Sequence, residues 1–208
     1  MEFKLEEEKE FVDKLLSQST VLNFEKGDFV YHAQSQPKGL YYVEQGLVGL
    51  IYFTAKGQES LLRLFKVGQF HGHRSLFSDE PYHASARCLE KCTLRFCSKS
   101  QVFELFDKEP KAYFFLARAL AKELRRAEVR SVLISEGDVI ERVSATLLFF
   151  KNLYPEHRWT RSEIAHFCAS RTPTVIKALG QLEAQGIIQQ KGHKIEILKP
   201  EQLLEFIE

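Results

Sequence analysis

The pattern of hydrophobic and polar positions is most regular in residues 109–136. This stretch contains no glycine, and its one proline is Pro110. Apolar and small side chains recur at alternating spacings of four and three, which is typical of a helix packed on a partner helix. We therefore expect a dimerisation helix; an ordinary long core helix is the alternative. The predicted dimer seam starts near Tyr113 and consists of Leu116, Ala117, Leu120, Leu124, Ala127, Ser131 and Ile134.

Before this helix, the pattern changes to short apolar runs separated by turn signals. An amphipathic helix is expected at residues 3–16, and runs rich in Val, Tyr, Phe and Leu follow it. The turns include Gln45-Gly46, Lys56-Gly57 and Val67-Gly68. Such turns at intervals of roughly 8 to 12 residues indicate an antiparallel sandwich or barrel. Roughly seven or eight strands in this space suit a jelly roll.

After the long helix, the chain carries a helix–helix joint. Gly137 is expected to end the first helix in the left-handed conformation. Asp138 and Glu141 form a capping box for a helix at 139–154, with Val143, Leu147 and Phe150 on its apolar face. This predicts a hinge at residues 135–138, although every helical bundle contains such connections.

The C-terminal stretch has the order of a winged helix-turn-helix. Thr160 and Glu163 form a capping box for a short helix, and Thr172 is expected to cap the next helix, with Pro173 at its start. Gly186 is expected to end that helix. Two short strands then turn at Lys191-Gly192 and form the wing.

These patterns together predict an α+β protein in three parts. Residues 1–107 form a jelly-roll effector or sensor domain, residues 108–137 the dimerisation helix and hinge, and residues 138–208 a winged helix-turn-helix domain.

Two stretches resemble parts of one known family. FEKGDFVYHAQSQPKGLYYVEQGLVGLIYFTAKGQESLLRLFKVGQFHGHRSLF, followed by HASARCLEKCTLRFCSKSQVFELF, resembles the cyclic-nucleotide-binding domain. TRSEIAHFCASRTPTVIKALGQLEAQGIIQQKGHKIEIL resembles the DNA-binding half of the CRP/FNR (cyclic-AMP receptor) family. The resemblance implies a homodimeric transcription regulator that binds a near-palindromic operator in double-stranded DNA. An activator would also bind RNA polymerase.

The phosphate-binding part of the resemblance is altered. Nucleotide-binding members hold the ribose with a Glu and the cyclic phosphate with an Arg, but His73 and His83 stand at these positions, with Ala84 after the second. A mostly neutral imidazole does not replace a guanidinium paired with phosphate. We therefore do not expect cyclic AMP to be the effector, whose identity stays open. The expected effector pocket comprises Gly72, His73, Arg74, Ser75, His83, Ala84, Ala127 and Glu128.

The family pattern also implies which residues meet DNA. Arg161 stands at a phosphate-contacting position, and Ser170, Arg171 and Thr174 lie at the turn and helix start. Lys177 can donate to guanine, whereas Pro173 can only touch a thymine methyl, so we expect an operator that differs from those of common members. Thr172 and Gln181 share the exposed helix face, and Lys191, His193 and Lys194 lie in the wing.

The amino-acid composition limits which kinds of binding site and which cellular location are expected. The chain has 208 residues, 27% of them charged, a net charge of +1 and four cysteines. The cysteines fit no zinc spacing, so free thiols are expected, with a redox role for Cys88, Cys92 and Cys97 as an alternative. The N-terminus lacks a signal h-region, which favours a cytoplasmic protein without a membrane partner.

Two other functions are kept as alternatives. His71 and His73 would face the same way on a strand, so a metal or haem site, as in a cupin-like enzyme, is conceivable. The second alternative is a ligand-free regulatory interaction protein. Because no acid/base pair, nucleophile elbow or phosphate-binding glycine loop occurs, we predict a non-enzyme with no catalytic residues, no metal and no cofactor.

Overall fold

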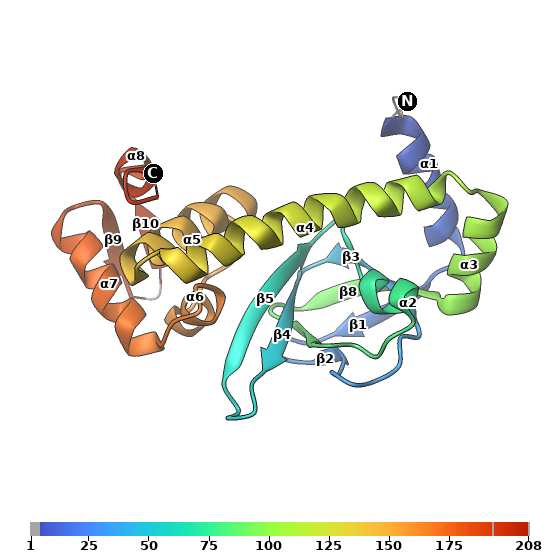
Figure 1. Ribbon diagram of the computed structural model, residues 1–208, viewed down its shortest axis with the longest axis horizontal. Helices are drawn as coiled ribbons and strands as arrows, with labels where there is room; N and C mark the ends of the chain where they lie inside the picture. The colour runs from blue at the N-terminus through green and yellow to red at the C-terminus, as the bar shows by residue number, and fades with distance from the viewer. Residues whose placement is uncertain (1–4, 193, 208) are drawn as a thin grey trace. The chain divides into compact units, whose positions relative to one another are not determined.

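The computed structural model describes residues 5–192 and 194–207, which divide into two compact units (Figure 1). The first unit comprises Met1–Gln58 and Leu62–Leu124, and the second comprises Glu59–Leu61 and Arg125–Glu208. None of the helices in the described ranges is long and apolar enough to cross a membrane.

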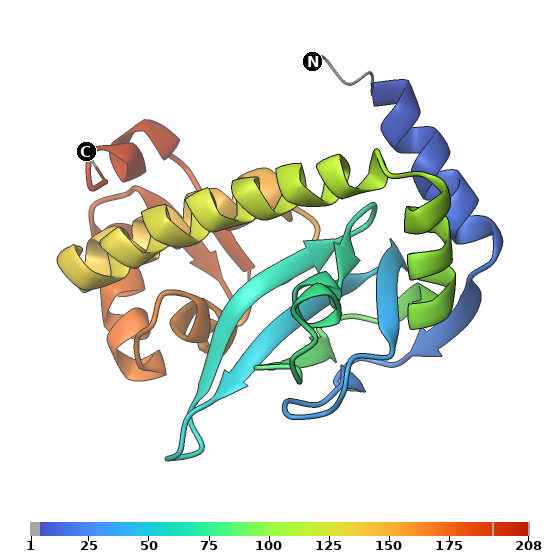
Figure 2. The ribbon, with the colours of Figure 1, turned by 45° about the vertical axis from the view of Figure 1, so that its right-hand side comes forward.

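The first unit is a sandwich of two four-stranded antiparallel sheets. One sheet has the order β1-β8-β3-β6 and the other β2-β7-β4-β5, so strands distant in sequence are neighbours in both (Figure 2). The strands are β1 (Thr20–Phe24), β2 (Phe29–Tyr31), β3 (Gly39–Gln45), β4 (Leu47–Phe53), β5 (Glu59–Lys66), β6 (Phe70–His71), β7 (Ser85–Cys88) and β8 (Cys92–Ser98).

The core of the sandwich lies between the two sheets. It includes Val43 and Leu94 from the first sheet and Val48, Leu50 and Ala86 from the second, each 3% exposed or less. Along β8, Cys92 and Leu94 are buried while Thr93 and Arg95 are half-buried, as expected of a strand with one face in the core. Strand β4 is instead buried through five successive residues, 47–51. The predicted jelly-roll architecture is confirmed.

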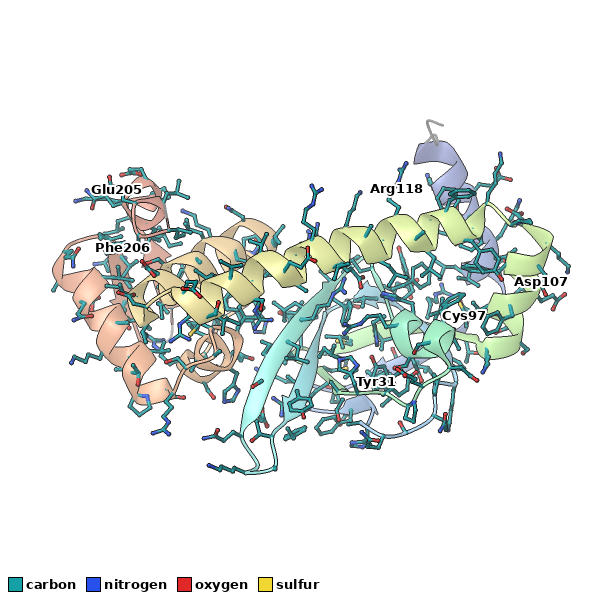
Figure 3. The ribbon with its side chains drawn as sticks, in the orientation of Figure 1. Tyr31, Cys97, Asp107, Arg118, Glu205 and Phe206 are labelled. Carbon is teal, nitrogen blue, oxygen red and sulfur yellow. The ribbon has the colours of Figure 1, made fainter. Side chains whose placement is uncertain are left out.

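Three helices pack around one end of the sandwich. They are α1 (Leu5–Ser17), α2 (His73–Ser78) and α3 (Lys99–Lys108). Phe11 and Leu15 of α1 are buried against Val102 and Phe106 of α3 in a second apolar cluster, to which Cys97 also belongs (Figure 3). The amphipathic helix predicted at 3–16 is thus observed from Leu5; its first two residues lie outside the described ranges.

The long helix α4 spans Ala112–Glu136 and is followed by α5 (Val139–Leu153). The Asp138–Glu141 capping box between them is confirmed: the Asp138 carboxylate accepts from Glu141 N at 3.0 Å, and Asp138 N donates to the Glu141 carboxylate at 2.6 Å. The left-handed Gly137 was a wrong prediction, since this residue is not among the glycines with positive φ. Gly137 is instead needed because a Cβ there would lie 2.6 Å from the Leu133 carbonyl oxygen.

The second unit contains the predicted winged helix-turn-helix. Its elements after α5 are α6 (Arg161–Phe167), α7 (Thr172–Ala184), β9 (Ile188–Lys191), β10 (Lys194–Ile197) and α8 (Pro200–Leu204). Val143, Leu147 and Phe150 of α5 are each 5% exposed or less, as predicted. Trp159, before α6, stacks on Phe150 with ring centroids 3.5 Å apart.

Candidate nucleic-acid interface and effector pocket

The two helices of the helix-turn-helix are joined by a tight turn. Thr160 caps α6 by accepting from Glu163 N at 3.1 Å, as predicted. Ala169 then takes a φ of +51°, which lets Ser170 N donate to the Ala165 carbonyl at 2.9 Å. The left-handed conformation is unfavourable for any residue with a Cβ and most unfavourable for bulky or β-branched ones, so a small side chain at Ala169 limits this cost.

The predicted cap of α7 is one residue off. Thr172 lies inside the helix and Arg171 is its N-cap, without a side-chain hydrogen bond. The reason is that Val175 N already donates to the Arg171 carbonyl at 3.0 Å, so the first helical turn starts there. Gly186 ends the helix with a φ of +66°, as predicted, and Ile187 behind it is buried.

The α7 helix has one buried and one exposed face. Val175, Leu179 and Leu182 are fully buried, and Ala178 is nearly so. The residues predicted to meet DNA lie on the other side: Pro173, Thr174, Lys177 and Gln181 are exposed, and Thr172 is half-buried. A helix with this division can lay its exposed face in a major groove while its stripe holds it to the domain.

Arg161 and the wing are bound to each other. The Arg161 guanidinium donates through Nη2 to Gln190 Oε1 and to the Gly192 carbonyl, at 2.9 Å each. Lys191 and Lys194 are exposed, and each forms an ion pair with Glu196, at 3.1 and 2.8 Å. His193 lies outside the described residues.

The expected effector pocket exists, but it is nearly filled. Its cavity volume is about 20 Å³, which is room for about one water molecule. Six predicted residues line it, namely Gly72, His73, Arg74, Ser75, His83 and Ala84, together with Tyr31, Leu50, Phe65 and Tyr82. Tyr31 and Tyr82 stack with ring centroids 3.7 Å apart. Ala127 and Glu128 are exposed on α4 and belong to the second unit.

A carboxylate from α4 binds His73, which stands where the family resemblance implies a Glu. His73 Nε2 lies 3.0 Å from Glu123 Oε2, and Arg63 on β5 forms an ion pair with the same carboxylate. Burial alone would raise the pKa of Glu123, but hydrogen bonds from His73 and Arg63 outweigh it and lower the pKa to about 2. Glu123 is therefore an anion held by the Arg63 guanidinium and the His73 imidazole.

The residue at the phosphate-binding position is also paired. Arg74 Nη2 and His83 Nε2 are 3.3 Å apart. Burial, and then the Arg74 charge, lower the pKa of His83, so its imidazole is the neutral acceptor of this contact. Burial, and then the charge of Arg63, also lower the pKa of Arg74.

His71 and His73 do not share a strand, so the predicted common direction is wrong. His71 ends β6, Gly72 follows with a φ of +91°, and His73 begins α2. His71 is fully buried and stacks on Tyr41 and Phe65, with ring centroids 5.2 and 5.1 Å away. Within the described ranges, no group of three or more His, Cys, Asp or Glu side chains is placed to hold a metal ion.

The four cysteines are buried free thiols, as predicted.

The predicted seam residues of α4 differ in how exposed their side chains are. Leu116 packs on the apolar cluster of α1 and α3, whereas Leu124 is 61% exposed. Phe114, Val129 and Val132 were not included in the seam, yet each is more than half exposed. The sequence analysis did not identify Glu123, Arg63 or Gln190 as site residues, because none of them belongs to a recognisable sequence motif.

Comparison with known proteins assigns both units. The model of the cyclic nucleotide-binding domain matches residues 21–109, and that of the Crp-like helix-turn-helix domain matches residues 141–206. The cyclic AMP receptor protein of Thermus thermophilus is 27% identical over 190 residues, which cover 90% of this chain and 88% of that protein. The anaerobic regulatory protein of Bacillus subtilis is 25% identical over 188 residues, covering 84% and 77%.

Solved structures show the same fold over nearly the whole chain. The c-di-GMP-responsive global regulator CLP of Xanthomonas campestris has a TM-score of 0.79 at 22% identity, covering 91% of this chain and 98% of its own. FixK2 of Bradyrhizobium japonicum has a TM-score of 0.80 at 22% identity, covering 90% and 96%.

Proposed function

The chain belongs to the CRP/FNR family of DNA-binding transcription regulators, and on this premise we propose that it binds a near-palindromic operator as a homodimer whose control is independent of cyclic AMP. The exposed polar face of α7, opposite its buried stripe, is the observation that supports DNA binding. Each subunit would place one α7 in a major groove, about 34 Å from the other. Such a protein works in the cytoplasm, and an activator would in addition contact RNA polymerase.

The exposed residues divide into two roles. Lys177 reaches base edges and donates to guanine, while Pro173 offers only apolar contact to a thymine methyl. Ser170, Arg171 and Thr174 lie at the N-terminus of α7, where hydroxyl, amide and guanidinium groups favour phosphate oxygens. Arg161 and the wing lysines extend the phosphate contacts.

Independence from cyclic AMP is supported by what fills the pocket. Ligand pockets usually have about 300 to 1,000 Å³, whereas this cavity has about 20 Å³. The His73 and Arg63 side chains already bind the Glu123 carboxylate. His83 is a neutral hydrogen-bond acceptor paired with Arg74. A cyclic phosphate would have to displace an internal anion without gaining a bidentate arginine at position 83.

The DNA-binding proposal is tested by selecting bound sequences from randomised duplex DNA at two salt concentrations, without added ligand. We expect a two-fold symmetric motif with half-sites about one helical turn apart, bound more weakly at high salt. Enrichment of no motif would contradict the proposal.

Two substitutions then separate the roles on the selected operator. We expect Arg171→Ala to weaken binding to all sequences and to reduce the salt slope by about two, because one phosphate contact is lost in each of the two subunits. Lys177→Ala should relax the base preference at one position of each half-site. Lys151→Ala, which removes an exposed lysine on α5, is the control and should change neither quantity.

Cyclic AMP is tested directly by calorimetric titration and by its effect on operator affinity. We expect no heat of binding and no change in affinity at millimolar nucleotide. Binding with an accompanying gain in DNA affinity would contradict ligand independence while leaving DNA binding intact.

A further inference from the structure

The side chain of Gln190 joins three separate elements of the C-terminal unit. Its Oε1 accepts from Arg161, the first residue of α6, at 2.9 Å. Its Nε2 donates to Glu183 Oε2, near the end of α7, at 2.9 Å, and its backbone N donates to Glu183 Oε1 at 2.6 Å. Since Arg161 also binds the Gly192 carbonyl, one network runs from α7 through β9 to α6 and the turn of the wing.

An amide suits this position because it lies between a cation and an anion. Its oxygen can only accept and its nitrogen can only donate, so the oxygen must face the Arg161 guanidinium and the nitrogen the Glu183 carboxylate. The opposite orientation would leave both contacts unmade. The network therefore fixes the rotamer of Gln190 and, with it, the position of the Arg161 guanidinium.

The wing depends on such support. It consists of two strands of four residues each, and an isolated two-stranded hairpin is at best marginally stable. Ile188 anchors the base of the hairpin in the core, being 1% exposed, but Lys191 and Lys194 flank a turn with exposed side chains. The hydrogen bond from Arg161 to Gly192 is the contact that reaches this turn.

We propose that Gln190 is a positioning residue for DNA binding, which holds the wing and the Arg161 guanidinium in fixed relation to α7. This inference rests on the proposed function, because Arg161 and the wing lysines are taken to meet phosphates. Groups held in place before binding lose less conformational entropy when the complex forms. Gln190 itself needs no contact with DNA, since the polar atoms of its side chain already bind Arg161 and Glu183.

The test measures operator affinity as a function of salt for Gln190→Met, which keeps the length of the side chain and removes both hydrogen-bonding groups. We expect affinity to fall about tenfold and the salt slope to decrease by about two to four, because in each of the two subunits Arg161 and a wing lysine no longer reach phosphates together. Loss of a direct contact from a neutral amide would leave the salt slope unchanged. An unchanged affinity, or a lower affinity with an unchanged slope, overturns the proposal.

A charge exchange provides the second test and also serves if Gln190→Met does not fold. Gln190→Glu alone places two carboxylates side by side and should lower affinity about tenfold or more. Adding Glu183→Gln restores a donor–acceptor chain from residue 183 to Arg161 and should recover affinity to within about threefold. A pair that binds no better than Gln190→Glu alone overturns the proposal.

The matched control is Gln189→Met on the neighbouring, exposed position of β9, which should alter neither affinity nor salt slope. Two failures are distinguishable. If the wild-type protein selects no operator, the proposed function fails. If it selects one and Lys177→Ala weakens it, but the Gln190 variants do not, this inference alone fails.

Discussion

His71 is a histidine that the fold keeps neutral. Burial, followed by the charges of His73 and Arg63, lowers its pKa from 6.5 to about 3. Its two ring nitrogens have no hydrogen-bond partner, and aromatic rings surround it. The imidazole therefore acts as one more aromatic ring in the core, at the cost of two unsatisfied polar atoms.

This cost depends on pH in a defined direction. Above about pH 6.5 both the folded and the unfolded state hold His71 neutral, so its contribution is constant. As the pH falls from there towards 3, only the unfolded state takes up the proton, and stability is lost. Between about pH 7.5 and 5.5 the loss should be about 1.4 kcal/mol.

The substitution His71→Phe should remove that part of the pH dependence. We expect urea unfolding of the wild type and of the variant, measured at both pH values, to differ by about 1.4 kcal/mol in the loss of stability. The other histidines are common to both proteins and cancel in this comparison. Parallel pH profiles would show that His71 is not held neutral.

At the scale of helices and strands, sequence patterns predicted most features that depend on residues close together in the chain. The capping boxes at Asp138 and Thr160, the buried stripe of α7 and the turn at Gly186 all follow from residues within one or two turns of each other. The His71–His73 prediction failed for a local reason: it assumed an unbroken strand, but Gly72 takes a φ of +91° and the chain turns into α2.

Such patterns could not predict the contacts that His73 of the effector pocket makes with distant parts of the chain. Glu123 lies 60 positions from Arg63 and 50 from His73 along the chain. Their pairing depends on α4 lying against the sandwich, and no periodicity encodes that contact. The same holds for Gln190 and Arg161, which are 29 positions apart.

Helix α7 contains a glycine, Gly180, in its interior. A glycine inside a helix costs roughly 0.5 to 1 kcal/mol relative to alanine. It is exposed, and a Cβ added there would meet no atom within 4 Å, so packing in the free protein does not require it. It lies one turn after Lys177, on the face assigned to DNA, where the missing side chain permits close approach of the duplex.

Gly180→Ala should therefore change two properties in opposite directions. We expect the free energy of unfolding to rise by roughly 0.5 to 1 kcal/mol, because the backbone loses less entropy on folding. Operator affinity should fall, because the added methyl would lie between α7 and the groove. Denaturant titration and DNA binding on the same preparation measure both, and a stabilised variant with unchanged affinity would refute the close approach.

For the whole molecule, the exposed apolar residues of α4 are the feature that a second subunit would cover. Leu124 and Val132 are each 61% exposed. Large apolar side chains gathered on one helix in this way mark an association surface.

Leu124→Glu should dissociate the homodimer and, with it, two-site DNA binding. A monomer binds one half-site, so we expect operator affinity to fall about a hundredfold or more, because the second contact is no longer intramolecular. Sedimentation equilibrium measures the oligomeric state, and Lys122→Glu, at an exposed position on the other side of α4, is the control. A variant that stays dimeric would place the dimer contact elsewhere.

The stacking of Trp159 on Phe150 also gives the chain an optical label. It is the only tryptophan among 208 residues, it lies in the second unit, and its indole N–H donates to the Tyr154 carbonyl at 3.4 Å. Excitation at wavelengths where tyrosine no longer absorbs therefore reports on the winged domain alone. The seven tyrosines, most of them in the sandwich, report mainly on the first unit. Tryptophan fluorescence can thus follow the second unit in the unmodified protein, without an attached dye.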